Sequence, residues 1–302
     1  MKPLLIVLLG VTALTLVGCE SDNENSDALS IVATTTYIGD MAQSIGGDAV
    51  EVQTLMGVGV DPHDYEPRQS DTRRLEAADV IIINGLNLEE RMGDVIAQID
   101  SAQLVVLGEH VDEDDLIYES HGTVDPHVWF DIDLWSQLTG VVGEALGEAD
   151  PDNKAMYETR TEEYLQDLSM LDDYVSNRVD ALDASDRILI TAHDAFAYFG
   201  RAYGFEVHAV QGVSTDSEAS VRDIEELAEL LVELDVNSVF WESSVPQGTV
   251  DALVEAALDL DHDVSVGGEL YSDSTGGFSQ GHETYIRTFR SNVDTIVDAL
   301  EE

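Results

Sequence analysis

From Ser30 onward, short runs of β-branched and other apolar residues alternate with stretches whose apolar residues recur every three or four positions. The early runs are SIVATTT, AVEVQTLM, VIIINGL and QLVVLGE, and after residue 186 the same alternation returns with RILITA, FEVHAVQG, VNSVFWESS and HDVSVGGEL. Strands that alternate with amphipathic helices are typical of parallel sheets covered by helices. The pattern therefore predicts two parallel-sheet α/β lobes, over residues 29–150 and 184–302.

The segment between the two lobes is predicted to be one long helix, over residues 151–183. It contains Pro151 near its first turn and then neither glycine nor a strand pattern. Its apolar residues share one helical face: Tyr157, Tyr164, Leu165, Leu168, Leu171, Val175, Val179 and Leu182. About 30 residues at about 1.5 Å each give a length of about 45 Å. Because such a helix bends little, we expect local loop movements, above all at Gly276 and Gly277, and no large closure of the lobes.

The N-terminus carries the pattern of an exported, lipid-anchored protein. Residues 1–18, MKPLLIVLLGVTALTLVG, combine an early lysine with a long apolar stretch and small residues, as in a secretory signal peptide. Cys19, the only cysteine, follows within LVGC, which resembles a bacterial lipobox. We expect Cys19 to be acylated and to hold the protein on the lipid bilayer outside the cytoplasm, in a periplasm or at the cell surface. Residues 19–28 would then be the lipidated cysteine and a polar tether.

The charge balance narrows the choice of partners. The 302 residues include 62 acidic and 13 basic side chains, for a formal net charge of −49. A surface this acidic repels a phosphate backbone, so nucleic acid is excluded as a partner. The carboxylates are spread through segments that also carry periodic apolar residues, which indicates a solvated acidic surface of the kind found in very salty environments.

Three of the eight histidines stand where regular elements end. His63 follows the run AVEVQTLM, His127 precedes the helical stretch DIDLWSQL, and His193 ends the run ILITAH. The first two belong to a repeated Asp-Pro-His motif, in which proline restricts the backbone before the histidine. Asp273 likewise follows the last strand pattern. In parallel α/β lobes, loops at the carboxyl ends of strands converge on the ligand.

Three imidazoles and one carboxylate, two ligands from each lobe, form a set that suits Zn²⁺ and accepts Mn²⁺. For each Asp-Pro-His copy taken alone, ordinary turn chemistry stays open as the alternative. If all three imidazoles titrate near pH 6.5, the metal affinity should fall about a thousandfold per pH unit in acid. The other five histidines have positions typical of solvated or packed side chains: His110, His121, His208, His262 and His282.

Motifs along nearly the whole chain resemble the metal-receptor family (cluster A-I) of ABC-transporter solute-binding proteins, the TroA-like zinc and manganese lipoproteins. They are VATTTYIGDMAQSIGG, LMGVGVDPHDYEP, DVIIINGLNLE, DPHVWFD, TAHDAFAYFGRAYGF, QGVSTDSEAS, FWESSVP and GGELYSDS. The resemblance implies two lobes joined by one helix, with one metal ion in the cleft. Its metal-binding places correspond to His63, His127, His193 and Asp273. Manganese-preferring members usually have glutamate where this chain has His193. The histidine therefore favours zinc, or the binding of both zinc and manganese.

Two details leave the metal and the wider role open. Many zinc receptors carry a long histidine-rich loop before the second histidine, whereas residues 111–120 here are acidic, and their role stays undetermined. The resemblance implies a monomeric receptor, not an enzyme, that passes Zn²⁺ or Mn²⁺ to an ABC-transporter permease. One alternative is a surface adhesin of the same family. Another is a zinc-dependent hydrolase with Glu242 as its base, although a role behind a ligand or in packing suits Glu242 better.

Overall fold

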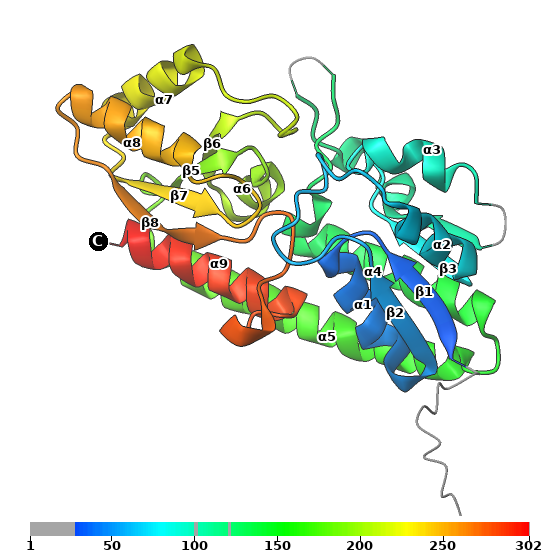
Figure 1. Cartoon of the computed structure of the whole chain (residues 1–302). Helices are drawn as coiled ribbons and strands as arrows, with labels where there is room; N and C mark the ends of the chain where they lie inside the picture. The colour runs from blue at the N-terminus through cyan, green and yellow to red at the C-terminus, as the bar shows by residue number, and fades with distance from the viewer. Residues whose placement is uncertain (1–27, 100–101, 120–121, 302) are drawn as a thin grey trace, which may run out of the picture.

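The computed structural model describes residues 28–99, 102–119 and 122–301. The expected signal peptide, Cys19 and nearly all of the tether lie outside these residues. Two lobes sit side by side above a layer of long helices (Figure 1). The predicted fold class, two parallel-sheet α/β lobes joined by a long helix, is confirmed.

The first lobe contains a four-stranded parallel sheet in the order β2-β1-β3-β4. Every residue of β3 is buried, as expected for a sheet covered on both faces. The strands are β1 (Leu29–Ala33), β2 (Val50–Thr54), β3 (Val80–Ile83) and β4 (Gln103–Val106). The helices of this lobe are α1 (Thr36–Gly46), α2 (Gln69–Ala77), α3 (Gly93–Ile96) and α4 (Ile132–Ala149).

The second lobe contains all four predicted strands, paired two by two. Strand β5 (Ile188–His193) pairs in parallel with β6 (Glu206–Gln211), and β7 (Ser238–Glu242) pairs in parallel with β8 (Ser265–Leu270). Strands β5 and β7 lie next to each other without forming a ladder of backbone hydrogen bonds. The helices are α6 (Ala197–Tyr203), α7 (Val221–Leu234), α8 (Gly248–Asp259) and α9 (Tyr285–Leu300).

The linking helix is α5 (Lys154–Val179), which runs beneath both lobes (Figure 1). Its 26 residues span about 39 Å at about 1.5 Å each, somewhat less than predicted. The predicted apolar face is buried, with Leu165 only partly covered. Helix α4 packs on α5 from the first lobe and α9 packs on it from the second, so three helices form the base of the molecule.

The described residues form three hydrophobic core clusters, one within each lobe and one that continues from the first lobe into the second. Phe130 of the first lobe and Phe196 of the second have ring centroids 4.3 Å apart. Tyr37 on α1 lies 5.6 Å from Trp129 and 5.8 Å from Tyr285 on α9, again between ring centroids. Rotating one lobe against the other would break this shared packing, which supports the expectation of local movements only.

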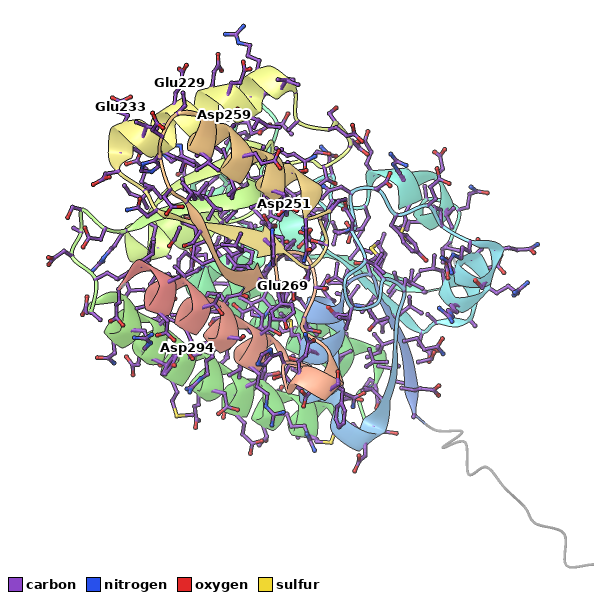
Figure 2. All side chains as sticks on the ribbon, turned by 60° about the vertical axis from the view of Figure 1, so that its left-hand side comes forward. Glu229, Glu233, Asp251, Asp259, Glu269 and Asp294 are labelled. Atoms are coloured by element: carbon purple, nitrogen blue, oxygen red, sulfur yellow. The ribbon has the colours of Figure 1, made fainter. Side chains whose placement is uncertain are left out.

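Short 3-10 helices complete the connections. They are η1 (Gly47–Ala49), η2 (Glu90–Met92), η3 (Leu107–His110), η4 (Glu113–Asp115), η5 (Val128–Phe130) and η6 (Phe278–Gln280). Within the described ranges, no helix combines the length and apolar character needed to cross a bilayer. Figure 2 shows carboxylates distributed over α7, α8, β8 and α9, in keeping with a solvated acidic surface.

Candidate metal centre

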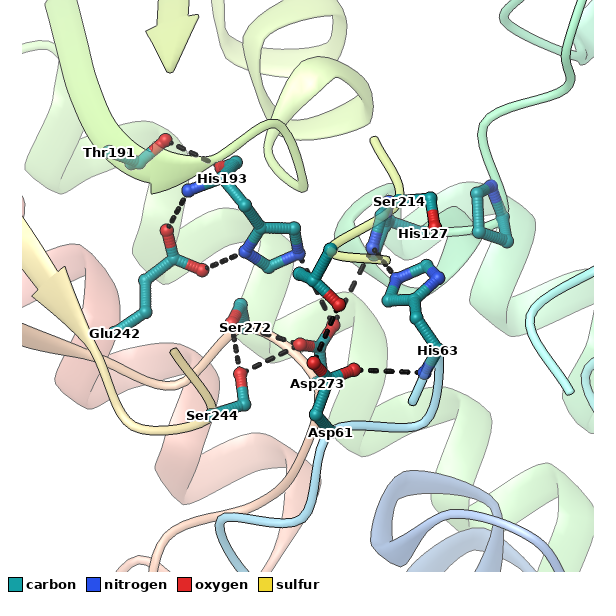
Figure 3. A network of polar contacts seen from close by, with 12 residues as sticks. Asp61, His63, His127, Thr191, His193, Ser214, Glu242, Ser244, Ser272 and Asp273 are labelled. Atoms are coloured by element: carbon teal, nitrogen blue, oxygen red, sulfur yellow. Dashed lines mark hydrogen bonds and ion pairs between the residues drawn. The ribbon is translucent and has the colours of Figure 1, made fainter. Parts of the chain in front are cut away.

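The structure brings together all four residues proposed from the sequence (Figure 3). His63 lies in the loop after β2, His127 directly precedes η5, His193 is the last residue of β5, and Asp273 follows β8. One ligand atom from each lies within 4.8 Å of every other, and the exposed fractions are 6%, 0%, 0% and 2%. Among the described residues, no other group of three or more such side chains meets this criterion.

The distances between the facing atoms fit one small ion. His63 Nε2 lies 3.3 Å from His127 Nε2, and Asp273 Oδ1 lies 3.5 Å from His127 Nε2 and 3.6 Å from His193 Nε2. Tetrahedral zinc with bonds of about 2.0–2.1 Å separates its ligand atoms by about 3.3–3.4 Å. His193 Nε2 and Asp273 Oδ1 are buried without a hydrogen-bond partner in the described part of the chain, and a bound cation would satisfy both.

The repeated Asp-Pro-His motif has a common local structure. Asp61 Oδ1 accepts the backbone N–H of His63 at 2.9 Å, and Asp125 Oδ1 accepts that of His127 at 2.9 Å. An aspartate that accepts the N–H two residues on fixes a turn, and the intervening proline restricts it further. Each motif therefore presents its histidine from a rigid turn. Neither aspartate was among the residues predicted for the site, although a position two residues before a histidine is a recognisable signal.

Carboxylates also stand behind two of the imidazoles. Asp125 Oδ1 lies 2.7 Å from His127 Nδ1, and Glu242 Oε2 lies 2.5 Å from His193 Nδ1. Glu242 Oε1 accepts the backbone N–H of His193 at 2.8 Å (Figure 3). A carboxylate at Nδ1 keeps the proton there and directs the lone pair of Nε2 toward the centre. Glu242 thus supports His193 from behind, which is the role that the sequence favoured over that of a base.

Asp273 is held so that one oxygen faces the imidazoles. Ser244 donates a hydrogen bond to Oδ2 at 2.7 Å, while Oδ1 faces His127 and His193. Residues 272–276 are buried and hydrogen-bonded, and the expected mobility at Gly276 and Gly277 stays a prediction. The contacts of residues 272–276 come from both lobes: Trp129 Nε1 to Ser272 O at 2.9 Å, Gly59 N to Ser274 Oγ at 2.8 Å, Thr275 N to Thr36 Oγ1 at 2.7 Å, and Gly276 N to Thr288 Oγ1 at 3.0 Å.

The protonation of the metal-free site differs among the three imidazoles. Burial lowers the pKa of His63 to about 3. Burial also disfavours the charged form of His127, but Asp125 and Asp273 outweigh it and raise the pKa of His127 to about 9. Glu242 and Asp273 similarly outweigh burial and raise the pKa of His193 well above its usual value. Although burial raises it, the pKa of Asp273 stays well below its usual range because His193 and His127 face it.

The histidines that the sequence set aside lie elsewhere. His208 Nε2 contacts Glu206 Oε1 at 2.8 Å, His262 Nε2 lies 2.7 Å from the backbone oxygen of Val236, and His282 Nδ1 lies 3.3 Å from a tyrosine hydroxyl. His110 ends η3, and His121 falls outside the described residues. None of the described members of this set belongs to the buried group.

Known proteins resemble the chain over nearly its full length. The family described as ZnuA, "Zinc-uptake complex component A periplasmic", matches residues 31–299. The manganese-binding lipoprotein MntA of Bacillus subtilis is 42% identical over 298 residues, which cover 98% of this chain and 97% of the relative. The zinc-binding protein TroA of Treponema pallidum is 42% identical over 271 residues, which cover 89% of this chain and 88% of the relative. The solved structure of periplasmic zinc-binding TroA superposes with a TM-score of 0.89 at 41% identity and covers 90% of this chain and 99% of its own. The chain belongs to the ZnuA family of periplasmic zinc-uptake components, as its motifs and fold indicate.

Proposed function

We propose that the protein is the extracytoplasmic receptor of an ABC-type metal importer, and that His63, His127, His193 and Asp273 bind one Zn²⁺ or Mn²⁺ ion as cargo. One observation carries the proposal: three Nε2 atoms and one carboxylate oxygen face each other in a buried space at distances that match a single ion. Burial on this scale is costly for polar atoms without a partner, and a metal ion repays that cost.

The ligand set identifies the cargo only as a class of ion, Zn²⁺ or Mn²⁺. One relative at 42% identity is named for manganese and another for zinc. Three imidazole nitrogens with one oxygen are softer than the oxygen-rich sites that favour Mn²⁺, so we expect zinc to bind more tightly. Their place at the carboxyl ends of strands from both lobes also suits a carrier, because the ion touches both halves of the molecule.

The location and the partners of the protein are proposed from its similarity to the relatives reported above. The relatives named for manganese are lipoproteins, and a component of an ABC transporter delivers its cargo to a membrane permease. We infer that the signal peptide is removed, that acylated Cys19 anchors the protein to the bilayer outside the cytoplasm, and that the chain works as a monomer. Residues 29–150, 151–183 and 184–302 would be the first lobe, the linking helix and the second lobe.

The other functions considered from the sequence are less well supported. A catalytic zinc keeps an open position and a nearby base. Here four side chains surround the centre, and Glu242 is occupied by the backbone and the ring of His193. We therefore infer that the protein is not a hydrolase. The relatives reported above are named as metal-binding proteins and not as adhesins, so the adhesin alternative is not retained.

The proposal is tested by calorimetric titration of chelator-treated protein with Zn²⁺ and with Mn²⁺. We expect one ion per chain, and a loss of affinity by orders of magnitude when His63, His127 or His193 is replaced by alanine. His208→Ala is the matched control, because this partly exposed histidine contacts Glu206 and lies outside the group. Unchanged affinity in one of the three variants would remove that histidine from the site, and no binding by the parent protein would refute the proposal.

A further inference from the structure

His63 is the most exposed of the four proposed ligands. Its exposed fraction is 6%, against 0% for His127 and His193 and 2% for Asp273. A hollow of about 90 Å³ is lined by His63 and Pro126 of the first lobe and by Val213, Ser214 and Asp216 of the second. The second-lobe wall of this hollow belongs to the segment between β6 and α7, residues 212–220, which we call the β6–α7 loop.

Hollows border the β6–α7 loop on both sides near His63. Opposite the hollow at His63, the loop borders a larger one of about 560 Å³, lined among others by Asp61, Thr215 and Asp216. Asp216 lines both hollows, so the stretch from residue 213 to residue 216 separates them. A displacement of this short stretch would join the two hollows and open the side of His63 to solvent.

Three contacts that involve side chains join the β6–α7 loop to the first lobe. The longest is a hydrogen bond of 3.4 Å that Glu119 Oε1 accepts from the backbone N–H of Val213. Thr215 Oγ1 donates a hydrogen bond to Asp61 Oδ2 at 2.6 Å. The other oxygen of Asp61 accepts the backbone N–H of His63, so a single carboxylate joins the loop to a proposed ligand (Figure 3). Arg91 forms the third contact, with Nη2 2.8 Å from Asp216 Oδ1 and Nη1 2.8 Å from Asp64 Oδ1.

Charge makes the arginine contact more than an isolated surface pair. Asp64 and Glu66 of the first lobe face Asp216 of the second across the gap, and Arg91 contacts all three. Without its positive charge, only carboxylates would meet there, and like charges at short range repel. The contact is exposed, so salt should weaken it.

The remaining walls of the site are fixed more firmly. Asp125 and Glu242 each bind the backbone N–H and contact the ring of their histidine. The loop that carries Asp273 is buried over residues 272–276 and is bound by Trp129 and Thr36 of the first lobe and by Thr288 of the second. The least constrained route to the centre therefore passes His63.

We propose that the β6–α7 loop is the gate through which the ion enters and leaves, and that Thr215 and Arg91 are positioning residues that hold this gate closed. This inference rests on the proposed metal-binding function and assigns the moving part of the same site. With the gate loosened, the four ligands stay the same, so the ion should both leave and enter faster, and the equilibrium affinity should change less than either rate.

The test is the dissociation rate of Zn²⁺, followed by stopped-flow mixing of the loaded protein with excess chelator. Thr215→Val removes the hydroxyl and keeps the shape of the side chain. We expect dissociation about tenfold faster, the factor that corresponds to the lower range for a hydrogen bond to a charged group. Thr215→Ser is the matched control, since its hydroxyl can still reach Asp61, and it should restore the slow rate.

Arg91→Gln tests the arginine contact on the surface, where a substitution leaves the fold intact. At low salt its dissociation should be faster than that of the parent protein, and at about 1 M salt, where the screening length is about 3 Å, the two rates should converge. Arg222→Gln is the matched control, because Arg222 is an exposed arginine that pairs with Glu226 within α7. It should leave the rate unchanged at every salt concentration.

The outcomes separate the gate from the function. If the parent protein binds no Zn²⁺, the proposed function fails. If the parent and variant proteins bind Zn²⁺ but Thr215→Val and Arg91→Gln release it at the parent rate, the gate is refuted and the function stands. Should Thr215→Val fail to fold, as judged by circular dichroism, the salt-dependent rate of Arg91→Gln decides the question alone.

Discussion

Glu242→Gln probes how the buried carboxylate prepares His193 for binding. Glu242 serves two donors of the same residue: its Oε1 accepts the backbone N–H at 2.8 Å, and its Oε2 lies 2.5 Å from Nδ1. Glutamine has the same shape but offers one oxygen and one NH₂ group. Its oxygen can face only one of the two donors, so its NH₂ group must face the other.

Both orientations of the glutamine weaken the site. If the NH₂ group faces Nδ1, the ring carries its proton on Nε2 and cannot coordinate. If the NH₂ group faces the backbone N–H, a buried donor of His193 loses its acceptor, which costs about 1–3 kcal/mol. Outer partners of metal-bound histidines typically contribute 10- to 100-fold in affinity. We therefore expect the dissociation constant for Zn²⁺ to rise about 10- to 100-fold, or about 1.4–2.7 kcal/mol.

Competition titrations with a zinc-binding dye, from pH 9.5 to pH 6.5, measure this loss. Glu242 also raises the pKa of His193, so removing its charge reduces proton competition. The deficit of Glu242→Gln should therefore be largest at high pH and shrink as the pH falls. Glu206→Gln is the matched control, because Glu206 contacts His208 Nε2 at 2.8 Å on the surface. Equal affinities for Glu242→Gln and the control at pH 9.5 would refute the reasoning.

Three further predictions concern the ligands themselves. Because the pKa of His127 is raised to about 9 and that of His193 is raised as well, while that of His63 is about 3, metal binding should displace two protons near neutral pH and not three. The affinity should then fall by up to about a hundredfold per pH unit below pH 9, and a pH-independent affinity in titrations over this range would contradict the assignment. His193→Glu should lower the ratio of Zn²⁺ to Mn²⁺ affinity because oxygen is a harder ligand, and an unchanged ratio in competition titrations would exclude His193 as a ligand. Asp273→Asn should weaken Zn²⁺ binding by at least about tenfold because the ion loses its one anionic ligand, and calorimetry that gives the parent affinity would remove Asp273 from the site.

The fold was largely predictable because its signals are local. Eight strand patterns and the apolar face of α5 follow from residues that are neighbours in the sequence. The core cluster shared by the two lobes could not be predicted, because the contact of Phe130 with Phe196 joins segments that are far apart in the chain. For the same reason the sequence could not show that β5 and β7 lie side by side without a backbone ladder.

The four proposed ligands could be selected because each follows or precedes a regular element at the same edge of a lobe. The groups that hold them could not all be selected in this way. Asp125 has a local signal, its position two residues before His127, whereas Thr215 and Arg91 reach Asp61 and Asp216 only across the gap between the lobes. The expected mobility at Gly276 and Gly277 stays a prediction: glycine allows a flexible backbone, whereas the N–H of Gly276 donates a hydrogen bond to Thr288 of α9.

The central claim is most directly tested by a crystal structure of the protein loaded with Zn²⁺, with anomalous diffraction collected on both sides of the zinc edge. We predict a single strong anomalous peak, about 2.0–2.2 Å from the Nε2 atoms of His63, His127 and His193 and from Oδ1 of Asp273. A peak held by other side chains, or no peak among these four residues at full occupancy of the protein with zinc, would contradict the account.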